Sequence, residues 1–185
     1  MKSFRILLTF GLCLCLFTAC SKDNSEKTKK SNTTENKEKS GQAFIKDDQS
    51  APNVLQIAIG SKDHSTLVAA VQAAELENSL VNAGPLMVFA PTNEAFSKLP
   101  EGTVKNLLKP ENKDALANIL KYHVTPGNYS KDFLKRFKKL GQANNKYVKV
   151  EVVDGEPIIG GARILASVKA GNGIVHVIDK VLLPQ

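Results

Sequence analysis

One stretch of the sequence changes from strand to helix within nine residues: Val88-Phe89-Ala90-Pro91-Thr92-Asn93-Glu94-Ala95-Phe96. Its first part belongs to the continuous apolar run 86–90, which is typical of a buried strand, and Pro91 ends that run. Thr92 or Asn93 can cap the helix that follows, because either side chain can accept a hydrogen bond from a backbone N–H group at a helix start. Glu94 in the first turn favours the positive end of the helix dipole. We therefore expect a buried strand that leads directly into a short helix.

A second informative stretch lies near the end of the chain, Gly173-Ile174-Val175-His176-Val177-Ile178-Asp179-Lys180-Val181-Leu182-Leu183-Pro184. Alternate residues of a strand face opposite sides of its sheet, and here both sides would carry apolar side chains. Val175 and Val177 would face one side, and His176 and Ile178 the other. Apolar side chains on both faces are typical of a strand that is covered on both sides. The sequence therefore predicts a strand near the centre of the sheet.

Helical periodicity and capping residues predict several helices in the first part of the domain. The expected helices span about 65–82, a few residues after Thr92, then 103–108, 113–122 and 130–140. Ser65 and Ser130 are the expected caps of the first and the last. Pro110 separates the third helix from the fourth, because proline cannot occupy a helix interior.

Strand-like alternation follows these helices. Residues 147–153 alternate with a period of two, Asp154-Gly155 can form a turn, and a return strand begins at 157–159. Further strands are expected at 164–168 and 174–183, around a glycine-containing turn. Because helices come first and strands second, we expect an α+β domain with a largely antiparallel sheet.

Three separated segments together resemble motifs of the fasciclin domain family: residues 88–96, Tyr122-His123-Val124 and residues 173–184. Their order and spacing also match, and the resemblance covers residues 50–185. It implies a fasciclin-like β-sandwich wedge, with several helices packed on it in the N-terminal half, as one domain over residues 49–185. It also implies adhesion or matrix binding without catalysis.

The N-terminus has the order of an export signal. Lys2 and Arg5 precede the apolar run 6–17, which is shorter than the roughly 20 residues of a membrane-spanning helix. Leu16-Phe17-Thr18-Ala19-Cys20 resembles a lipobox, which implies a lipoprotein signal peptide over 1–19 and acylation (palmitate or a similar chain) of Cys20. Phe17 replaces the usual aliphatic residue, so an ordinary signal peptide cut near Ala19 stays open as the alternative.

The cysteines support lipidation independently. Cys13, Cys15 and Cys20 are the three in the chain, and removal of the signal peptide leaves one. A single exported cysteine cannot form an internal disulfide, and attachment to lipid protects it from oxidation. Residues 21–48 are polar and charged, which predicts a flexible tether because so few apolar side chains cannot offset the entropy of ordering.

The charge pattern argues against a nucleic-acid binder. The chain carries 25 Lys and Arg residues against 18 Asp and Glu residues, a net charge of +7 that includes the two basic residues of the signal peptide. Such a modest excess favours anionic surfaces only slightly. We expect no specific nucleic-acid partner.

The sequence predicts no catalytic residue, metal ligand or cofactor. His64, His123 and His176 are too far apart for a short zinc motif, and no Gly-x-Ser-x-Gly nucleophile elbow occurs. The alternative is a periplasmic small-molecule carrier or enzyme. An apolar cavity with converging polar groups would favour that alternative, and a filled core with a flat exposed patch would favour adhesion.

Two regions are candidates for partner binding. Tyr122-His123 matches a pair that the family resemblance links to adhesion in animal members, although we expect His123 to be a buried structural imidazole, and His176 likewise. Lys131, Lys135 and Lys138 have helical spacing within a basic segment, residues 131–139, that also contains aromatic side chains. We interpret it as a solvated helix face with its aromatic side chains in the core, and an anionic polysaccharide, lipid headgroup or extracellular DNA is the alternative contact.

One departure from the animal adhesive members limits the analogy. Ser167-Val168 stands where some of them carry an Asp-Ile dipeptide, so integrin binding through that acid is not expected. The hypothesis is a lipid-anchored bacterial protein, in the outer membrane and periplasmic or surface-exposed. It binds a membrane through its lipid and a protein or glycan ligand through its domain.

Overall fold

The computed structural model describes residues 51–82 and 84–184. Their contacts place them in one compact unit. The predicted signal peptide, Cys20 and the predicted tether lie outside the described residues, so their boundaries stay predictions. No helix within 51–82 or 84–184 has the length and hydropathy that a membrane crossing requires.

Short helices occupy the first half of the described chain. The α-helices are α1 (Val54–Gly60), α2 (Ser65–Ala73), α3 (Glu77–Asn82), α4 (Asn93–Ser97), α5 (Thr103–Leu107), α6 (Lys113–Tyr122) and α7 (Lys131–Leu134). Two 3₁₀ turns, η2 (Lys62–His64) and η3 (Pro110–Asn112), precede α2 and α6. Side-chain caps begin several of these helices: Asn53 accepts from the Gln56 N–H, Thr92 from the Ala95 N–H and Ser130 from the Phe133 N–H.

The strands form one seven-stranded sheet in the order β2-β1-β7-β6-β5-β4-β3. They are β1 (Leu86–Pro91), β2 (Val124–Pro126), β3 (Lys139–Gly141), β4 (Tyr147–Val153), β5 (Glu156–Ile159), β6 (Ala162–Ala170) and β7 (Gly173–Ile178). Only the pair of β1 and β7 is parallel in the described sheet. Gly173 is needed where this pair begins, since a Cβ there would clash with the carbonyl of Leu86.

The sheet curls until its two end strands meet. The Ala143 N–H, just after β3, donates to the Val124 carbonyl of β2 at 2.7 Å. Beside this bond, the buried Thr125 hydroxyl donates to the side-chain oxygen of Gln142 at 3.0 Å. These contacts give the sheet the wedge-like, nearly closed form that was expected.

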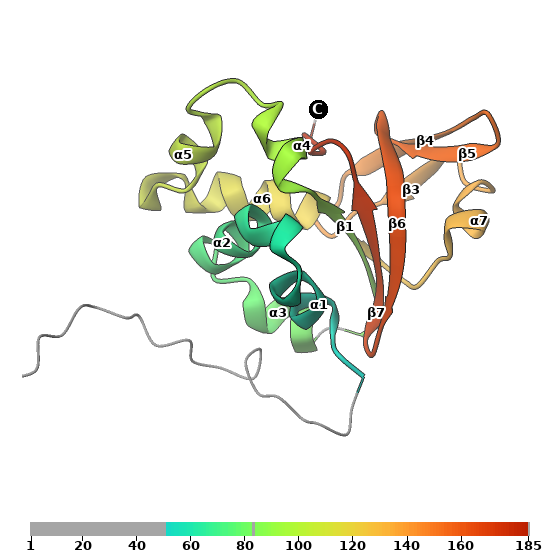
Figure 1. The fold of residues 1–185 in the computed structure, drawn as a ribbon, viewed down its shortest axis with the longest axis horizontal. Helices are drawn as coiled ribbons and strands as arrows, with labels where there is room; N and C mark the ends of the chain where they lie inside the picture. The colour runs from blue at the N-terminus through green and yellow to red at the C-terminus, as the bar shows by residue number, and fades with distance from the viewer. Residues whose placement is uncertain (1–50, 83, 185) are drawn as a thin grey trace, which may run out of the picture. The chain divides into compact units, whose positions relative to one another are not determined.

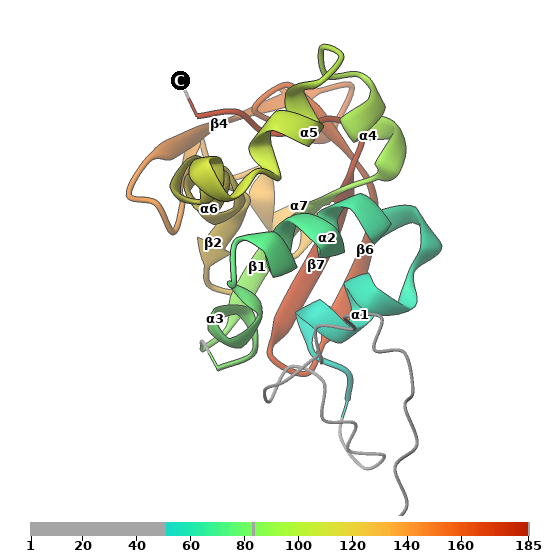
Figure 2. The ribbon, with the colours of Figure 1, turned by 90° about the vertical axis from the view of Figure 1, so that its left-hand side faces the viewer.

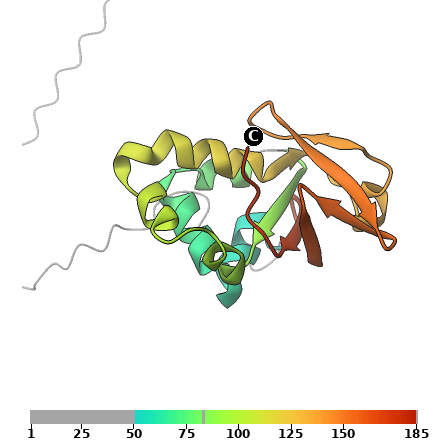
Figure 3. The same ribbon diagram turned by 90° about the horizontal axis from the view of Figure 1, so that it is seen from above.

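The strands β1 and β7 separate two cores. The helices α1 to α6 gather on one side of this pair, and β3 to β6 with α7 lie on the other (Figures 1 and 3). The helix-side core consists of Val54, Leu55, Leu67, Ala70, Val71, Ala74, Ala90, Leu116, Leu120 and Val175. The sheet-side core consists of Met87, Phe89, Tyr122, Leu134, Leu140, Val148, Val150, Ile159, Ala162, Ile164, Ile174, Ile178 and Leu182. Figure 2 shows α1 and α2 crossing in front of the sheet.

Most predicted elements are confirmed. The strand over 86–90, the Thr92 cap, the helix 113–122, the 147–159 hairpin and the central position of residues 174–178 all occur. The α+β class and the wedge are confirmed as well.

Two predicted helices are wrong in extent. The helix expected over 65–82 is broken into α2 and α3, because Glu75 adopts a left-handed conformation with φ of 54°. Ser65 does not cap it; Ser65 is its first residue, and the Thr66 N–H donates instead to the side chain of Asn93. The helix expected over 130–140 ends at Leu134, since Lys139 to Gly141 pair with β4.

Candidate functional site

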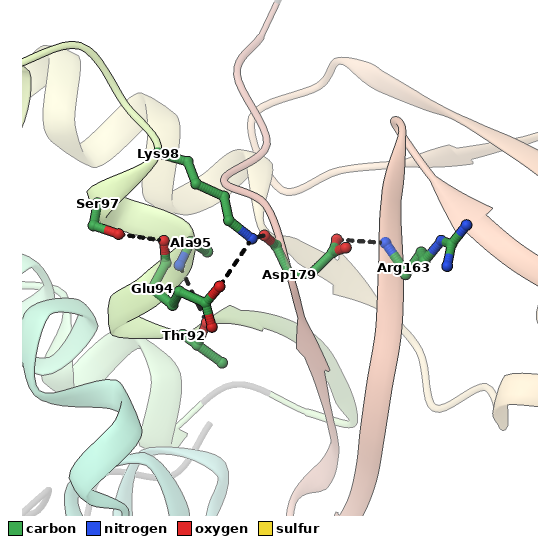
Figure 4. A network of polar contacts seen from close by, with 7 residues as sticks. All are labelled: Thr92, Glu94, Ala95, Ser97, Lys98, Arg163 and Asp179. Carbon is green, nitrogen blue, oxygen red and sulfur yellow. Dashed lines mark hydrogen bonds and ion pairs between the residues drawn. The ribbon is translucent and has the colours of Figure 1, made fainter.

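The first and last motifs meet through a polar network at the end of β7 (Figure 4). The ammonium of Lys98 lies 3.4 Å from a carboxylate oxygen of Glu94 and donates to the Asp179 carbonyl, also at 3.4 Å. The carboxylate of Asp179 accepts the Arg163 N–H at 2.8 Å, which ties β6 to the same point. This network joins α4, β6 and β7, so it explains the motif residues through structure and needs no ligand.

The Tyr122-His123 pair is buried at the end of α6. Tyr122 is 6% exposed, and its hydroxyl donates to the Tyr147 carbonyl at 3.0 Å. His123 is 3% exposed; its Nδ1 donates to the Ile119 carbonyl at 2.8 Å, and its Nε2 accepts the Leu182 N–H at 2.9 Å. These partners require a neutral ring, and burial lowers the pKa of His123 to about 4. The predicted burial and hydrogen bonding of His123 are confirmed, and a partner-binding role of this pair stays a prediction.

His176 has the opposite arrangement of ring protons. Its Nε2 donates to the Tyr129 carbonyl at 2.9 Å, and its Nδ1 accepts from the Ser167 hydroxyl at 2.7 Å. The ring is fully buried and stacks on Phe89 with centroids 5.9 Å apart. Burial lowers the pKa of His176 more than the hydrogen bond to Tyr129 raises it. The structural interpretation of His176 is therefore confirmed.

His64 is also buried, which the sequence did not indicate. Its Nδ1 lies 2.8 Å from the Ser61 hydroxyl, while its Nε2 has no hydrogen-bond partner within the part of the chain that the structure describes. Burial lowers the pKa of His64 and outweighs the charge of Asp63. The three histidines lie apart, and the described residues contain no group of three or more metal-binding side chains.

Lys131, Lys135 and Lys138 do not form the predicted helical stripe. Only Lys131 lies within α7. Its ammonium pairs with Glu156 at 2.6 Å, and that of Lys135 pairs with Asp132 at 2.8 Å, a contact that lowers the pKa of the Asp132 carboxyl. Lys138 is exposed in the bend before β3. Two of the three ammonium groups thus have acidic partners, and the predicted single helical stripe is wrong; a partner-binding role of these lysines stays a prediction.

The aromatic side chains of this segment pack on each other at the surface instead of entering the core together. The ring of Tyr129 lies 5.7 Å from that of Phe133 and 5.1 Å from that of Phe137. Tyr129 and Phe137 also pack against the sheet-side core, while Phe133 is 39% exposed. The expectation that these aromatic residues share one buried face is wrong for Phe133, whose ring still lies 5.5 Å from that of Phe137.

Cations cover the same surface. The guanidinium of Arg136 lies 5.1 Å from the centre of the Phe133 ring, and the ammonium of Lys139 lies 4.4 Å from the centre of the Tyr147 ring. Both distances fit cation–π contacts. We call this set, defined by its six residues, the aromatic–basic surface: Tyr129, Phe133, Arg136, Phe137, Lys139 and Tyr147.

Shallow depressions lie on both sides of Tyr129. One, of about 490 Å³, is lined by Phe137, Lys139 and Tyr147 with polar side chains of 142–146. The other, of about 520 Å³, is lined by Phe133, Lys169 and the turn at Asn128. Aromatic and Arg side chains are the types enriched where proteins bind partners. The sequence analysis located this segment but did not predict that its aromatic side chains lie together at the surface.

An apolar cavity of about 180 Å³ lies in the helix-side core, between β1 and the helices α1, α2, α3 and α6. Its lining is apolar apart from Ser79, Lys121 and His123. The sequence analysis did not predict this cavity, because it arises where short helices fail to fill the space above β1. An apolar cavity favours the carrier alternative, but few polar groups converge on this one.

Two asparagines hold the helices, and sequence reasoning missed both roles. The Asn172 side chain accepts the Val54 N–H at 2.9 Å and donates to the Leu80 carbonyl at 2.8 Å, so it ties the start of α1 to α3. The Asn93 side chain accepts the Thr66 N–H and donates to the Lys62 carbonyl, both at 3.0 Å. Asn93 lies in the first motif of the family resemblance, and Asn172 directly precedes the last one.

Comparison with known proteins agrees with the geometry. The fasciclin domain family matches residues 62–184. Protein sll1483 of Synechocystis is 46% identical over 136 residues, which are 73% of this chain and 75% of that protein. Transforming growth factor-beta-induced protein ig-h3 of Sus scrofa is 37% identical over 137 residues, which cover 71% of this chain and 19% of that protein.

The fold has a counterpart among solved structures. A FAS1 domain pair from the insect cell adhesion molecule Fasciclin I superposes with a TM-score of 0.64 at 20% identity, over 72% of this chain and 51% of that one. This chain thus spans about half the length of that structure. Together with the family match over most of the described residues, these likenesses show that the chain belongs to the fasciclin domain family.

Proposed function

We propose that this protein is a non-catalytic adhesion or matrix-binding protein that binds a protein or glycan ligand through the aromatic–basic surface. The observation that carries the proposal is the surface cluster of Tyr129, Phe133 and Phe137, in which Phe133 is 39% exposed and Arg136 lies over its ring. Exposed apolar side chains that gather in a patch mark interaction sites. The similar structure of Fasciclin I, an insect cell adhesion molecule, points the same way.

The charge of the domain supports an anionic ligand. Residues 49–185 contain 16 basic and 12 acidic side chains, and Arg136, Lys138 and Lys139 are exposed on or beside the aromatic–basic surface. Sulfated or carboxylated polysaccharides combine negative charge with ring faces that can lie on aromatic side chains. Attraction from a few exposed cations is screened at physiological salt, so aromatic contact is expected to supply the rest.

Heparin chromatography tests this surface. We expect the full chain to be retained at low salt, and the double variant Phe133→Ser, Arg136→Gln to elute at lower salt. The matched control is Leu165→Ser, Lys105→Gln, which also removes one exposed apolar side chain and one cation, but away from this surface. If the wild-type chain is not retained, or if the two variants elute together, the anionic-glycan form of the proposal is wrong.

We also propose that the domain is displayed from a bacterial membrane through acylation of Cys20, and the polar residues after that cysteine favour the outer membrane. Two or more acyl chains anchor a protein stably, whereas a single chain binds only reversibly. Cys20→Ser should move the protein from the membrane to the soluble fraction. Unchanged fractionation, with no fatty-acid mass on the N-terminal peptide, would argue for an ordinary signal peptide.

The alternative is a periplasmic small-molecule carrier or enzyme. The apolar cavity of the helix-side core favours a carrier over an enzyme, since Ser79, Lys121 and His123 are its few polar lining residues. A general base among them is not favoured, because both ring nitrogens of His123 already have backbone partners. The ligand that such a cavity could take is treated next.

A further inference from the structure

The cavity of the helix-side core is lined by side chains from every element around it. Leu55 and Ala58 come from α1, Leu67 from α2, Leu80 from α3, Val88 from β1 and Leu120 from α6. The lining is almost wholly apolar, so ordered water would find few hydrogen-bond partners inside. An apolar occupant is therefore favoured over water.

The size of the cavity limits the occupant. A cavity of about 150 Å³ lined by Leu, Ile and Phe side chains stays dry and binds one benzene molecule. The present cavity, of about 180 Å³, therefore accommodates an apolar group of about six to eight carbon atoms. A hydrocarbon chain longer than this must extend out of the mouth.

One cation lies at the mouth of the cavity. Lys121 lines the cavity and is itself exposed, and no carboxylate within the described residues pairs with it. The neighbouring His123 is neutral, since its ring bridges the Ile119 carbonyl and the Leu182 N–H. The interior is thus uncharged, while the rim carries one unpaired positive charge.

Helix α3 forms the most weakly held wall. None of its residues is buried, although Leu80 contributes to the cavity lining. Its C-terminal end is fastened to the turn before β7 by the bond from the Asn172 side chain to the Leu80 carbonyl. A wall with so little buried surface can move at small cost and admit a ligand.

From these features we propose that the helix-side cavity binds the hydrocarbon end of a single-chain anionic amphiphile, such as a fatty acid, with its acidic head beside Lys121. The apolar lining selects the chain, the volume limits its inserted part, and the lysine selects the sign of the head group. This site shares no residue with the aromatic–basic surface, so it adds a second binding function.

Three compounds with the same eight-carbon chain test the proposal: octanoate, 1-octanol and octylamine. Thermal unfolding of the full chain carrying Cys20→Ser, which removes any covalently attached lipid, should show the largest rise in Tm with octanoate. Octanol should give a smaller rise and octylamine the smallest. Equal or larger stabilisation by octylamine would overturn the role assigned to Lys121.

Two variants locate the site. Lys121→Gln should weaken octanoate binding about two- to fivefold and leave octanol binding unchanged, while the matched control Lys105→Gln on α5 should change neither. Ala58→Leu places a larger side chain in the cavity and should abolish binding of both compounds. Retention of full octanoate affinity by Ala58→Leu would place the ligand elsewhere.

Methyl NMR of the full chain carrying Cys20→Ser, with no substitution in the cavity, tests the proposal even if a cavity variant fails to fold. Octanoate should shift the methyl signals of Val54, Leu67 and Leu120 and leave those of Leu140 and Val148 in the sheet-side core unchanged. No shift at the cavity methyls with any compound would refute the proposal. Because heparin binding is measured at different residues, either proposed site can fail without the other.

Discussion

The two faces of the β1 and β7 pair differ in how completely they are packed. On the sheet side, Phe89, Leu134 and Ile178 have no exposed area. On the helix side, the elements are short and leave a cavity of about 180 Å³. The sheet side therefore specifies the fold, and the helix side retains room that a ligand can fill.

The same chemical change on the two faces measures this difference most directly. Leu134→Ala should lower the free energy of unfolding by about 2 to 5 kcal/mol, because a wholly buried side chain leaves a new cavity. Leu80→Ala, at the edge of the existing cavity, should cost only about 1 to 2 kcal/mol, because its side chain is only partly buried. Urea denaturation checks both, and equal losses would mean that the two faces are packed alike.

The buried ring of His123 should make the stability of the fold depend on pH. Burial lowers the pKa of His123 to about 4 in the folded protein, against 6.5 for an exposed histidine, so the unfolded chain binds an extra proton between these values. Stability contributed by the neutral ring is thus complete above pH 6.5 and is lost as the pH falls toward 4. The full difference corresponds to about 3 kcal/mol.

Replacement of the ring isolates this effect. His123→Gln should reduce stability at pH 7.5, and its unfolding free energy should fall less steeply than that of the wild type from pH 6.5 to 4.5. Lowered pKa values of His64 and His176 act in the same direction and remain in the variant. Parallel pH profiles for wild type and variant would contradict the assignment to His123.

A smaller effect is expected where the helix side is fastened to the sheet. Asn172→Ala removes the bonds to the Val54 N–H and the Leu80 carbonyl and should cost about 1 to 3 kcal/mol. Hydrogen exchange should accelerate in α1 and α3 and stay unchanged in α6. Acceleration spread evenly over all three helices would show that Asn172 does not hold the cavity walls specifically.

Local sequence signals predicted the elements that depend on nearby residues. Thr92 caps α4 through a bond three residues away, and α6 has the predicted bounds because Pro110 separates it from α5. Helix α1 was missed although its capping box of Asn53 and Gln56 is readable in the sequence. The short helix α7 could not be foreseen in the same way, since β3 ends the helical segment by pairing with β4.

The candidate sites were harder to predict, because they depend on contacts between residues far apart in the sequence. The burial of His123 was predicted from its apolar neighbours, but its partner Leu182 lies 59 residues away. The basic segment 131–139 was found by composition, yet the partner of Lys131 is Glu156 on another strand. The cavity exists only because four helices meet β1, so no single segment could reveal it.

The aromatic–basic surface is proposed to bind the partner, while Tyr122 and His123 are proposed to maintain the fold. Binding of each protein to immobilised cell-surface extract of its source organism, compared at equal folded fraction, separates these two roles. Phe133→Ser with Arg136→Gln should unfold within about 0.5 kcal/mol of the wild type and lose most of the binding, whereas His123→Gln should be less stable and bind normally. If His123→Gln abolishes binding while the surface double variant binds fully, the account is contradicted and the Tyr-His pair is the adhesive site.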